Sequence, residues 1–397
     1  MKLNLIEKSK TSIQESMTVQ KRLNSYMKLY KKNNRFLWIL SVIFPTVGMP
    51  AIYMHYLSNN ILWLSFPFIM TYMIAPFIDI YIGEYAENLP DEMQSQIEHD
   101  PYYKILTFIA VPVHITVFFI SSLYVGLMPL SIAEIVLIAS SAGLASGTAI
   151  NTGHELGHKK TKFERLLAKI VLAVPAYGHF MVEHNRGHHS KVSTPEDAAS
   201  SMMGENIYEF ALREMPQSLM NAISIERRRL KRINKSFWSN DNQLLHSFGL
   251  TLAIQGSLIF YFGLIMIPFL IIHNFIAWWQ LTSANYIEHY GLLRDKLPNG
   301  RYESCKPHHS WNSNHLVGNL HFFNLQRHSD HHTNPGRRYQ ILKNYKDLPT
   351  LPCGYLGCYL IAYFPWLWFR IMDKKLLELK HINHDLTKIN LHPRRSI

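Results

Sequence analysis

Cysteine is scarce in this chain. Its 397 residues include only Cys305, Cys353 and Cys358, and no two of them form a Cys-x-x-Cys pair. The low count argues against a disulfide framework, and the missing pair argues against an iron or zinc centre held by thiolates. We expect reduced thiols on the cytoplasmic side of a membrane.

A nucleotide-binding fingerprint is also missing. No Gly-x-Gly-x-x-Gly segment occurs in the sequence, so the chain is not expected to collect electrons from NAD(P)H by itself. The net charge of +12 raises the question of a nucleic-acid partner. Long apolar blocks make a membrane surface the better interpretation, and no nucleic acid is expected.

Positive charge is almost absent from one long stretch. Between residues 36 and 151 the only basic residue is Lys104, whereas the first 35 residues carry nine Lys and Arg. Basic loops stay on the cytoplasmic side of a membrane, so the Lys-rich and Arg-rich segments mark that side. A full-length apolar run without a small-residue cleavage site follows residue 35, which excludes a secretory signal peptide.

Six apolar runs are long enough to cross a bilayer, which takes roughly 20 residues. They pair into three hairpins whose turns contain no Lys or Arg. The runs cover residues 36–57, 61–82, 105–127, 131–153, 246–265 and 268–288. The sequence therefore predicts an all-α, polytopic membrane protein with six transmembrane helices, both termini in the cytoplasm and a His-rich cytoplasmic cap.

The same pattern divides the chain into three parts. These are a basic cytoplasmic segment (1–35), a membrane domain (36–375) with polar inserts at 154–245 and 289–353, and a polar tail (376–397). Residues 17–29 are predicted to form an amphipathic surface helix. The aromatic run 354–372, interrupted at Pro365, is predicted to lie at the membrane interface.

Histidine is the residue that stands out. The chain has 22 His, and 16 of them lie between residues 154 and 332. They gather in three clusters, Asn151-Thr152-Gly153-His154-Glu155-Leu156-Gly157-His158, Glu183-His184-Asn185-Arg186-Gly187-His188-His189 and Arg327-His328-Ser329-Asp330-His331-His332. Residues four apart share one face of a helix, so such clusters predict a multi-His metal site.

The residue type and the number of histidines indicate which metals fit the site and how many ions it holds. Imidazole suits zinc, copper, iron and nickel. Eight or nine His are too many for one ion and indicate two, and adjacent residues such as His331 and His332 can serve different ions. The segment His154-Glu155-x-x-His158 also fits the zinc-protease signature with Glu155 as general base. That reading leaves six clustered His without a role, yet an intramembrane zinc protease remains the alternative from a different class.

Together with Asn285-Tyr286-Ile287-Glu288-His289-Tyr290-Gly291, the three clusters resemble the integral-membrane di-iron desaturases and hydroxylases. The segment 285–291 and Leu325-Gln326-Arg327-His328-Ser329-Asp330-His331-His332 look specifically like the alkane 1-monooxygenase family, over about residues 36 to 375. The remaining alternatives within the superfamily are a fatty-acyl desaturase and a xylene-type methyl hydroxylase. A transporter would not need metal-binding residues concentrated at one face.

This resemblance implies a function, a cofactor and partners. It implies two non-haem iron ions, O2 as co-substrate, an alkane drawn from the bilayer and a 1-alcohol as product. It also implies a bacterial inner membrane, and electrons from NAD(P)H through rubredoxin reductase and rubredoxin. The implied iron ligands are His154, His158, His184, His188, His189, His289, His328, His331 and His332.

Several residues near the clusters are assigned lesser roles. Carboxylates beside the clusters are candidates to orient ligand imidazoles; they are Glu155, Glu183, Asp197, Glu288 and Asp330. His308, His309 and His315 are left out of the ligand set. The basic segments Arg227–Arg232 and Arg337–Arg338 are candidate contacts for the electron donor. Small residues of the fourth run, Gly143 and Gly147, either pack helices closely or leave room for an alkane channel.

Overall fold

The structure, a computed structural model, describes residues 35–394. Within this part of the chain every regular element is a helix, and β-type pairing is limited to isolated bridges. The predicted all-α class is therefore confirmed. The amphipathic helix predicted for residues 17–29 lies outside the described residues.

Five helical segments of the described chain are long and apolar enough to cross a membrane. They are Arg35–Ser58, Ile61–Ile82, Pro101–Leu127, Ile132–Gly157 and Gln243–His289. The first contains η1 (Arg35–Ile39), α2 (Leu40–Ile43), η2 (Phe44–Val47) and α3 (Gly48–Ser58), and the second contains η3 (Ile61–Ser65), α4 (Phe66–Ile69), η4 (Met70–Ile74) and α5 (Ala75–Ile82). The third and fourth are α7 (Pro101–Leu127) and α8 (Ile132–Gly157).

The fifth segment joins the last two predicted spans into one continuous helical stretch. It is 47 residues long, about twice the length that a bilayer requires. It bends at Gly263, whose φ of 77° ends α13 (Gln243–Phe262), and continues through η6 (Gly263–Ile265) into α14 (Met266–His289). Helices α13 and α14, of 20 and 24 residues, each match one predicted run, and the turn between them lies at Gly263 instead of near Pro268. The count of continuous segments is five and not six because these two helices are joined without a break.

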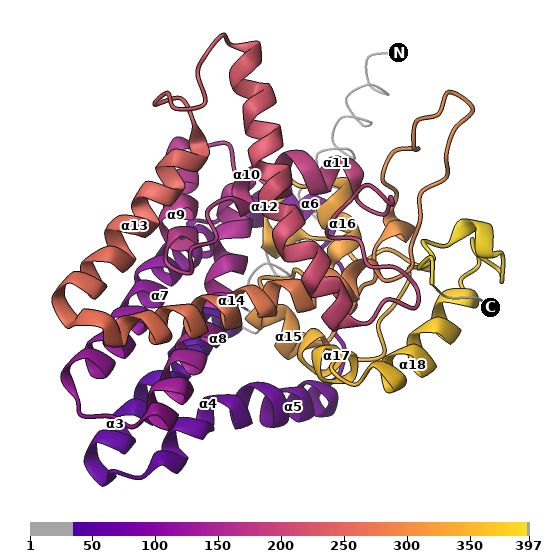
Figure 1. Cartoon of the computed structure of the whole chain (residues 1–397). Helices are drawn as coiled ribbons and strands as arrows, with labels where there is room; N and C mark the ends of the chain where they lie inside the picture. Colours follow the sequence, from indigo (N-terminus) through magenta and orange to yellow (C-terminus); the bar gives the residue numbers. More distant parts are fainter. Residues whose placement is uncertain (1–34, 395–397) are drawn as a thin grey trace, which may run out of the picture.

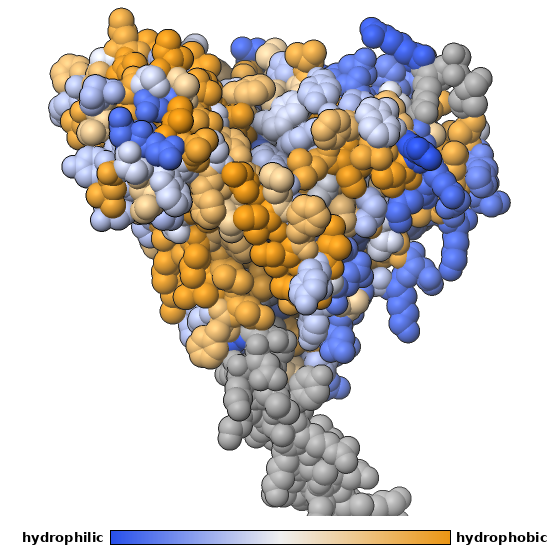
Figure 2. Space-filling view, turned by 90° about the horizontal axis from the view of Figure 1, so that it is seen from below, coloured by the Kyte–Doolittle hydropathy of each residue, from blue (hydrophilic) through white to orange (hydrophobic). Residues whose placement is uncertain are grey.

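The apolar helices lie together on one side of the molecule. Figure 1 shows α3, α4, α7, α8, α13 and α14 on the left and toward the bottom, with most segments after residue 290 on the right. Figure 2 shows hydrophobic residues over the left and centre of the face seen from below, and hydrophilic residues on the right. Large apolar side chains are exposed on α5, α7, α13 and α14, including Phe77, Leu127, Leu252 and Phe260. This distribution suits helices that face lipid.

Helices α8 and α14 pack closely because α8 carries glycine at the contact. A Cβ on Gly143 would lie 2.8 Å from the carbonyl oxygen of His273, and one on Gly147 would lie 2.6 Å from the Cβ of Gln280. The close packing predicted from the small residues is therefore present. Both helices run from their turns toward the His clusters, and α8 ends at Gly157, just after His154, whereas α14 ends at His289.

The remaining helices cover the ends of the spans. They are α6 (Asp91–Glu98), α9 (Lys162–Ala173), α10 (Phe180–Glu183), η5 (His184–His188), α11 (His189–Lys191), α12 (Ile207–Arg232), η7 (Pro307–His309), α15 (Leu316–His321), α16 (His328–Thr333), η8 (Tyr339–Ile341), α17 (Tyr355–Ala362), α18 (Pro365–Leu377) and η9 (Leu386–Lys388). The predicted interfacial run 354–372 folds as α17 and α18. With 8 and 13 residues, neither is long enough to span a bilayer.

Two polar contacts fix the cap to the spans. Asp79 on α5 is buried, and its Oδ1 accepts hydrogen bonds from the backbone N–H groups of Val317 and Gly318 at 2.8 and 3.1 Å. These groups begin α15, whose first N–H groups have no partner within the helix. The guanidinium of Arg327 donates to the carbonyls of Leu342, Tyr85 and Glu87. The segment that carries the last His cluster is thereby held against the chain that follows α5.

Candidate metal centre

The first His pair sits at the end of a buried helix. His154 lies in the last turn of α8, and His158 is the residue that caps its C-terminus. Their spacing of four places both imidazoles on one face, as the sequence predicted. Their ring centroids are 4.8 Å apart.

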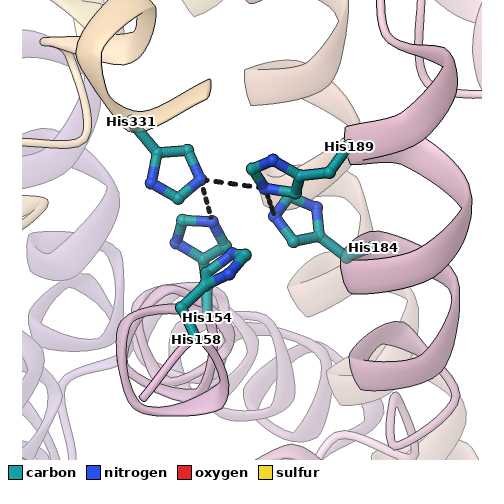
Figure 3. A group of neighbouring side chains, drawn as sticks. All are labelled: His154, His158, His184, His189 and His331. Carbon is teal, nitrogen blue, oxygen red and sulfur yellow. Dashed lines mark hydrogen bonds between the residues drawn. The ribbon is translucent and has the colours of Figure 1, made fainter. Parts of the chain in front are cut away.

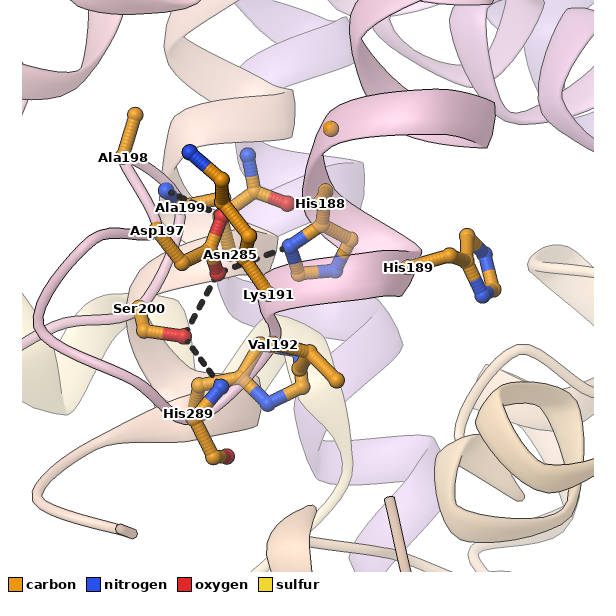
Figure 4. Close-up of polar contacts among 12 residues, drawn as sticks. His188, His189, Lys191, Val192, Asp197, Ala198, Ala199, Ser200, Asn285 and His289 are labelled. Carbon is orange, nitrogen blue, oxygen red and sulfur yellow. Dashed lines mark hydrogen bonds and ion pairs between the residues drawn. The ribbon is translucent and has the colours of Figure 1, made fainter. Parts of the chain in front are cut away.

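The second cluster lies on a helix with one wide turn. Helices α10 and α11 are joined without a break through η5, which is a π-helical turn. A π turn brings residues five apart, not four apart, onto one side of the helix. His184 and His189 therefore approach one another, with 3.0 Å between their Nε2 atoms, while His188 is turned away from them. Figure 4 shows the rings of His188 and His189 pointing in different directions.

The third cluster lies on the short helix α16, opposite the end of α14. His328 and His332 are four residues apart and point to the same side, with 2.9 Å between their Nε2 atoms. His331 points to another side, toward His154, at 3.0 Å between the Nε2 atoms. His289, the last residue of α14, lies 3.1 Å from His328 by the same measure.

These helices bring all nine predicted His ligands into two groups. The five-His group contains His154, His158, His184, His189 and His331. The four-His group contains His188, His289, His328 and His332. Figure 3 shows the five-His group, in which side chains from α8, α16 and the α10–α11 segment point toward one another. The two groups are neighbours, since the ring centroids of His189 and His332 are 4.5 Å apart.

The spacing of the nitrogens fits a metal ion in each group. Neighbouring Nε2 atoms lie 3.0 to 3.2 Å apart in the five-His group and 2.9 to 3.3 Å apart in the four-His group. Ligands held about 2.1 Å from one ion are separated by about 3 Å. A neutral imidazole has a single N–H, so converging Nε2 atoms cannot all be donors to one another. The donor set is that of a transition metal.

The protonation states of most of these imidazoles are those that metal binding requires. Burial, followed by the neighbouring imidazoles, holds the pKa of six of these His well below the ordinary value; they are His158, His184, His189, His328, His331 and His332. A low pKa keeps the imidazole neutral at physiological pH, and the neutral form is the one that binds a metal.

Outer contacts fix the orientation of two ligands. The Nδ1–H of His188 donates to Oδ2 of Asp197 at 2.9 Å, and the Ser200 hydroxyl donates to the same oxygen (Figure 4). Burial by itself lowers the pKa of His188, but Asp197 outweighs it and the net shift is upward. The Nδ1–H of His289 donates to the His309 carbonyl at 3.3 Å. Both bonds leave Nε2 free to face its group.

The other four carboxylates predicted to orient ligands are Glu288, Glu183, Glu155 and Asp330, and each has different surroundings. Oε2 of Glu288 lies 3.3 Å from Nε2 of His328, the nitrogen that faces the four-His group. Glu183 lies beside the π turn with one buried oxygen that has no hydrogen-bond partner, and burial raises its pKa to about 8. The contacts of Glu155 are to the Lys159 ammonium and the N–H of Tyr339.

Asp330 is turned away from the His groups. Its carboxylate accepts from the Tyr345 hydroxyl, the Asn334 amide and the N–H of Lys343, and it forms an ion pair with Arg337. Its neighbour His331 points the other way, into the five-His group. Asp330 thus anchors the loop after α16.

Three further histidines lie outside both groups. The His309 ring pairs with Glu303 at 3.3 Å, and His308 is its neighbour. The same carboxylate also binds the Lys306 ammonium, so a positive charge already satisfies it. His315 lies near Ser313 and Glu84.

A small inner cavity leads to the His groups. Three of the predicted ligands line it, His154, His184 and His328. Its other walls include Asn151, Gln280, Asn285 and Tyr359 beside the apolar side chains of Phe180, Leu281, Ala284, Phe322 and Leu325. Asn151, Asn285 and Leu325 belong to the quoted motifs, but no role was assigned to any of these wall residues from the sequence. Their signal was available, because Asn and Gln inside an apolar run seldom face lipid.

A second, outer cavity lies between α8 and the first two spans. Its walls include Val47, Pro67, Thr71, Ala145 and Leu356. Gly147, Gln280 and Phe322 line both cavities. The two spaces therefore adjoin at these three residues.

Membrane-length helices that end in two groups of converging imidazoles define a membrane-bound metalloenzyme. A family model described as fatty acid desaturase matches residues 130–370. The chain is 49% identical to alkane 1-monooxygenase 1 of Alcanivorax borkumensis, over 92% of this chain and 90% of the relative. It is 48% identical to an alkane 1-monooxygenase of Pseudomonas putida, over 91% and 90% of the two chains. The chain belongs to the alkane 1-monooxygenase family, within the fatty acid desaturase superfamily, and is a membrane-bound monooxygenase.

A more distant relative helps to judge the alternatives. The xylene/toluene monooxygenase hydroxylase component XylM of Pseudomonas putida is 29% identical over 63% of this chain. Both the identity and the coverage are lower than for the alkane enzymes.

Proposed function

We propose that this chain converts n-alkanes to 1-alcohols with O2, at a site that holds one iron ion in the five-His group and one in the four-His group. The observation that carries the proposal is the division of nine buried imidazoles into two adjacent groups at the end of a cavity between spans. The names of the relatives at 47–49% identity support the substrate class.

The reaction explains why metal is needed. An unactivated methyl group offers neither charge nor an acidic proton, so bound iron supplies the oxidising chemistry that side chains lack. The chain's own residues hold and orient the site. Asp197 and the His309 carbonyl fix the Nδ1–H tautomers of His188 and His289, and close packing of α8 on α14 excludes water.

The cavities support entry of the alkane from the bilayer, with one end leading. A chain in the outer cavity would pass Gly147, Gln280 and Phe322 before it reaches the predicted ligands. Such a path presents the terminal carbon first. Orientation would then override the intrinsic preference for the weaker methylene C–H bonds.

The alternatives receive less support. A zinc protease needs Glu155 to be free to activate water, but this carboxylate is bound by Lys159 and the N–H of Tyr339. His154 and His158 also belong to a group of five imidazoles, which is more than a protease zinc site uses. The xylene-type hydroxylase is the weaker match in identity and coverage.

Electrons are proposed to come from rubredoxin, itself reduced by an NAD(P)H-dependent rubredoxin reductase. His158 and His189 are half-buried, whereas every member of the four-His group is buried, so the five-His group lies nearer the surface. The exposed Lys160 and Arg186 lie close to these two ligands in sequence. Arg186 also lies 3.5 Å from Glu226, but 43% of its side chain stays exposed. Arg229, Arg337 and Arg338 already pair with the buried carboxylates of Glu226, Asp330 and Glu164, which leaves them less available to a partner.

We place the His groups and both termini on the cytoplasmic side of a bacterial inner membrane, with lipids around the spans. The near absence of Lys and Arg between residues 36 and 151 supports this orientation. Reporter fusions at Asn59, Pro129 and Gly263 should all signal the outside. A cytoplasmic signal at any of them would overturn the orientation.

Metal analysis and product analysis test the proposal together. Purified protein should contain two iron ions per chain, measured by plasma mass spectrometry. Gas chromatography of products from a series of n-alkanes should give 1-alcohols. A single zinc ion, or predominantly 2- and 3-alcohols from the unmodified protein, would refute it.

A further inference from the structure

The connection between α12 and α13 forms a firm corner. Glu226 on α12 is fully buried and accepts from Arg229 at 2.7 and 2.8 Å and from the N–H of Gln243 at 2.8 Å. Gln243 is the first residue of α13, so one carboxylate ties both helix ends together. Asn242 caps α13 through the N–H of Leu244 and donates its amide to the Phe237 carbonyl. The corner residues 233–242 are therefore held in place.

The outer surface of this corner is both basic and apolar. From Glu226 to Gln243 the chain carries six basic side chains and two acidic ones. Arg229 is neutralised by Glu226, and Lys235 lies 3.8 Å from Asp241. The exposed side chains of Arg227, Arg228, Lys231 and Arg232 form no ion pair with a described residue. Among these charges, Trp238 is 77% exposed and Ile233 is 45% exposed.

The corner also lies at the edge of the apolar bundle. Helix α13 is a peripheral part of a candidate span, and its Leu252 and Phe260 are 73% and 82% exposed. The start of α13 lies near the His groups, because its Leu244 packs in one cluster with Val182 of α10, which directly precedes the second His cluster. Figure 1 shows the end of α12 and the following loop projecting beyond the other helices at the top, before the chain turns down into α13.

We propose that residues 227–238 are a membrane-surface anchor that binds anionic phospholipid headgroups beside α13. Tryptophan at the end of a span prefers the headgroup level. Lys and Arg next to a span are attracted to anionic lipids within a Debye length. An acidic soluble protein would match the charges, but it would leave the exposed Trp238 and Ile233 and the neighbouring lipid-facing helix unexplained.

A spin label at the corner tests its position. Cys305 is the half-buried thiol and Cys353 and Cys358 are buried, so Cys305→Ser provides a background for labelling. The full chain with Trp238→Cys is labelled and placed in nanodiscs of phosphatidylcholine, alone or mixed equally with phosphatidylglycerol. The matched control label is at Asn299, on an exposed loop of the polar side.

The label at position 238 should collide with a water-soluble nickel chelate less often than the label at 299, because the headgroup layer excludes the chelate. Phosphatidylglycerol should increase this protection. The triple change Arg228→Gln, Lys231→Gln and Arg232→Gln should abolish the increase, because each basic residue at an anionic surface strengthens attachment by about fivefold. The control triple Lys296→Gln, Arg301→Gln and Lys346→Gln, at exposed positions elsewhere, should retain it.

Two outcomes would overturn the anchor. Water-like collision rates at position 238 in both lipids would place the corner in solution, where its charges would suit a soluble acidic partner. Equal protection in both lipids, unaffected by the triple change, would show contact with the membrane but no selection of anionic headgroups. Neither outcome would alter the proposed oxygenase activity, which is measured separately by its product.

Discussion

The Nδ1–H of His188 donates to Oδ2 of Asp197 at 2.9 Å, and both side chains are buried. This bond selects the tautomer in which Nε2 of His188 faces the other members of the four-His group. Asp197 lies nine residues further along the chain and is itself fixed by Ser200. The contact gives the four-His group a rigid support from outside its ligands.

The first prediction concerns this support. Asp197→Ala should weaken the metal held by the four-His group by about 10- to 100-fold, because the imidazole loses its fixed tautomer and orientation. Dialysis against graded chelator followed by metal analysis measures the loss. Asp197→Asn, which keeps an acceptor oxygen, should lose less. Glu205→Gln, a buried ion-pair partner of Arg213 away from the ligands, is the control; equal loss in it would remove the special role of Asp197.

The second prediction separates the two groups. His158→Ala removes a ligand of the five-His group, and His332→Ala removes one of the four-His group. Each should lower the iron content from about two ions toward one and remove most activity, since each leaves one metal under-coordinated. Mössbauer spectra should lose a different iron signal in each variant. His99→Ala, far from both groups, should change neither value. Full iron and full turnover in His188→Ala or His331→Ala would contradict the ligand assignment.

The third prediction concerns the alkane path. Val47 lines the outer cavity, so Val47→Phe should fill part of it and shorten the longest alkane accepted, without changing the oxidised carbon. Gas chromatography across an alkane series measures both. Val136→Phe, at an exposed position on α8, is the control.

Gly147, a small residue that could leave room for an alkane channel, is a poorer position for this test than Val47. A Cβ on Gly147 would strike the Gln280 side chain at 2.6 Å, so a bulky residue would disturb helix packing as well as the path. A shift from 1-alcohols to interior alcohols in Val47→Phe would argue against end-on entry.

Much of the centre could be predicted from the sequence because His spacing on a regular helix is simple geometry. His154 and His158, four residues apart at the end of α8, both face the five-His group. His328 and His332, four residues apart on α16, both face the four-His group. The spacing could not show the π turn at η5, which joins His184 to His189 and separates His188. Such a turn depends on tertiary packing and has no clear sequence signal.

The carboxylates were harder to assign. Asp330 is next to His331 in sequence, but neighbouring residues on a helix point in different directions, and Asp330 meets Arg337 and Tyr345 instead. Asp197 reaches His188 only because the chain turns back after α11. Contacts of this kind depend on the fold, so adjacency in the sequence is a weak guide to them.

The fourth prediction concerns electron supply. Purified protein should not turn over with NADH alone, and turnover with added rubredoxin should fall as salt rises through the screening range. Lys160→Glu and Arg186→Glu should raise the KM for rubredoxin with little change in kcat, because they alter steering and not chemistry. The triple change at Arg228, Lys231 and Arg232 is the comparison. If that change raised the KM and the first two did not, the donor would dock at the α12–α13 corner instead.

The last prediction concerns the pH dependence of stability. Glu214 on α12 is buried, and its carboxylate accepts from Thr282 at 2.8 Å and from Asn285 at 3.2 Å. Burial, only partly offset by these bonds, raises the pKa of Glu214 to about 7 from an ordinary value of 4.5. The folded chain therefore keeps this proton over a range in which the unfolded chain has lost it. Because the folded state binds more protons there, its stability should fall as the pH rises from about 4.5 to about 7.

Glu214→Gln tests this sign directly. The amide cannot ionise, so the variant should lose less Tm than the unmodified protein between about pH 5 and about pH 8. Thermal unfolding in detergent, followed by tryptophan fluorescence at several pH values, gives the comparison. Other buried groups titrate in both proteins, so the difference between the two curves isolates Glu214. Glu92→Gln, at an exposed position on α6, should leave the curve unchanged. Parallel curves for the unmodified protein and Glu214→Gln would mean that Glu214 is already ionised in the folded state, and that Thr282 and Asn285 bind a carboxylate anion.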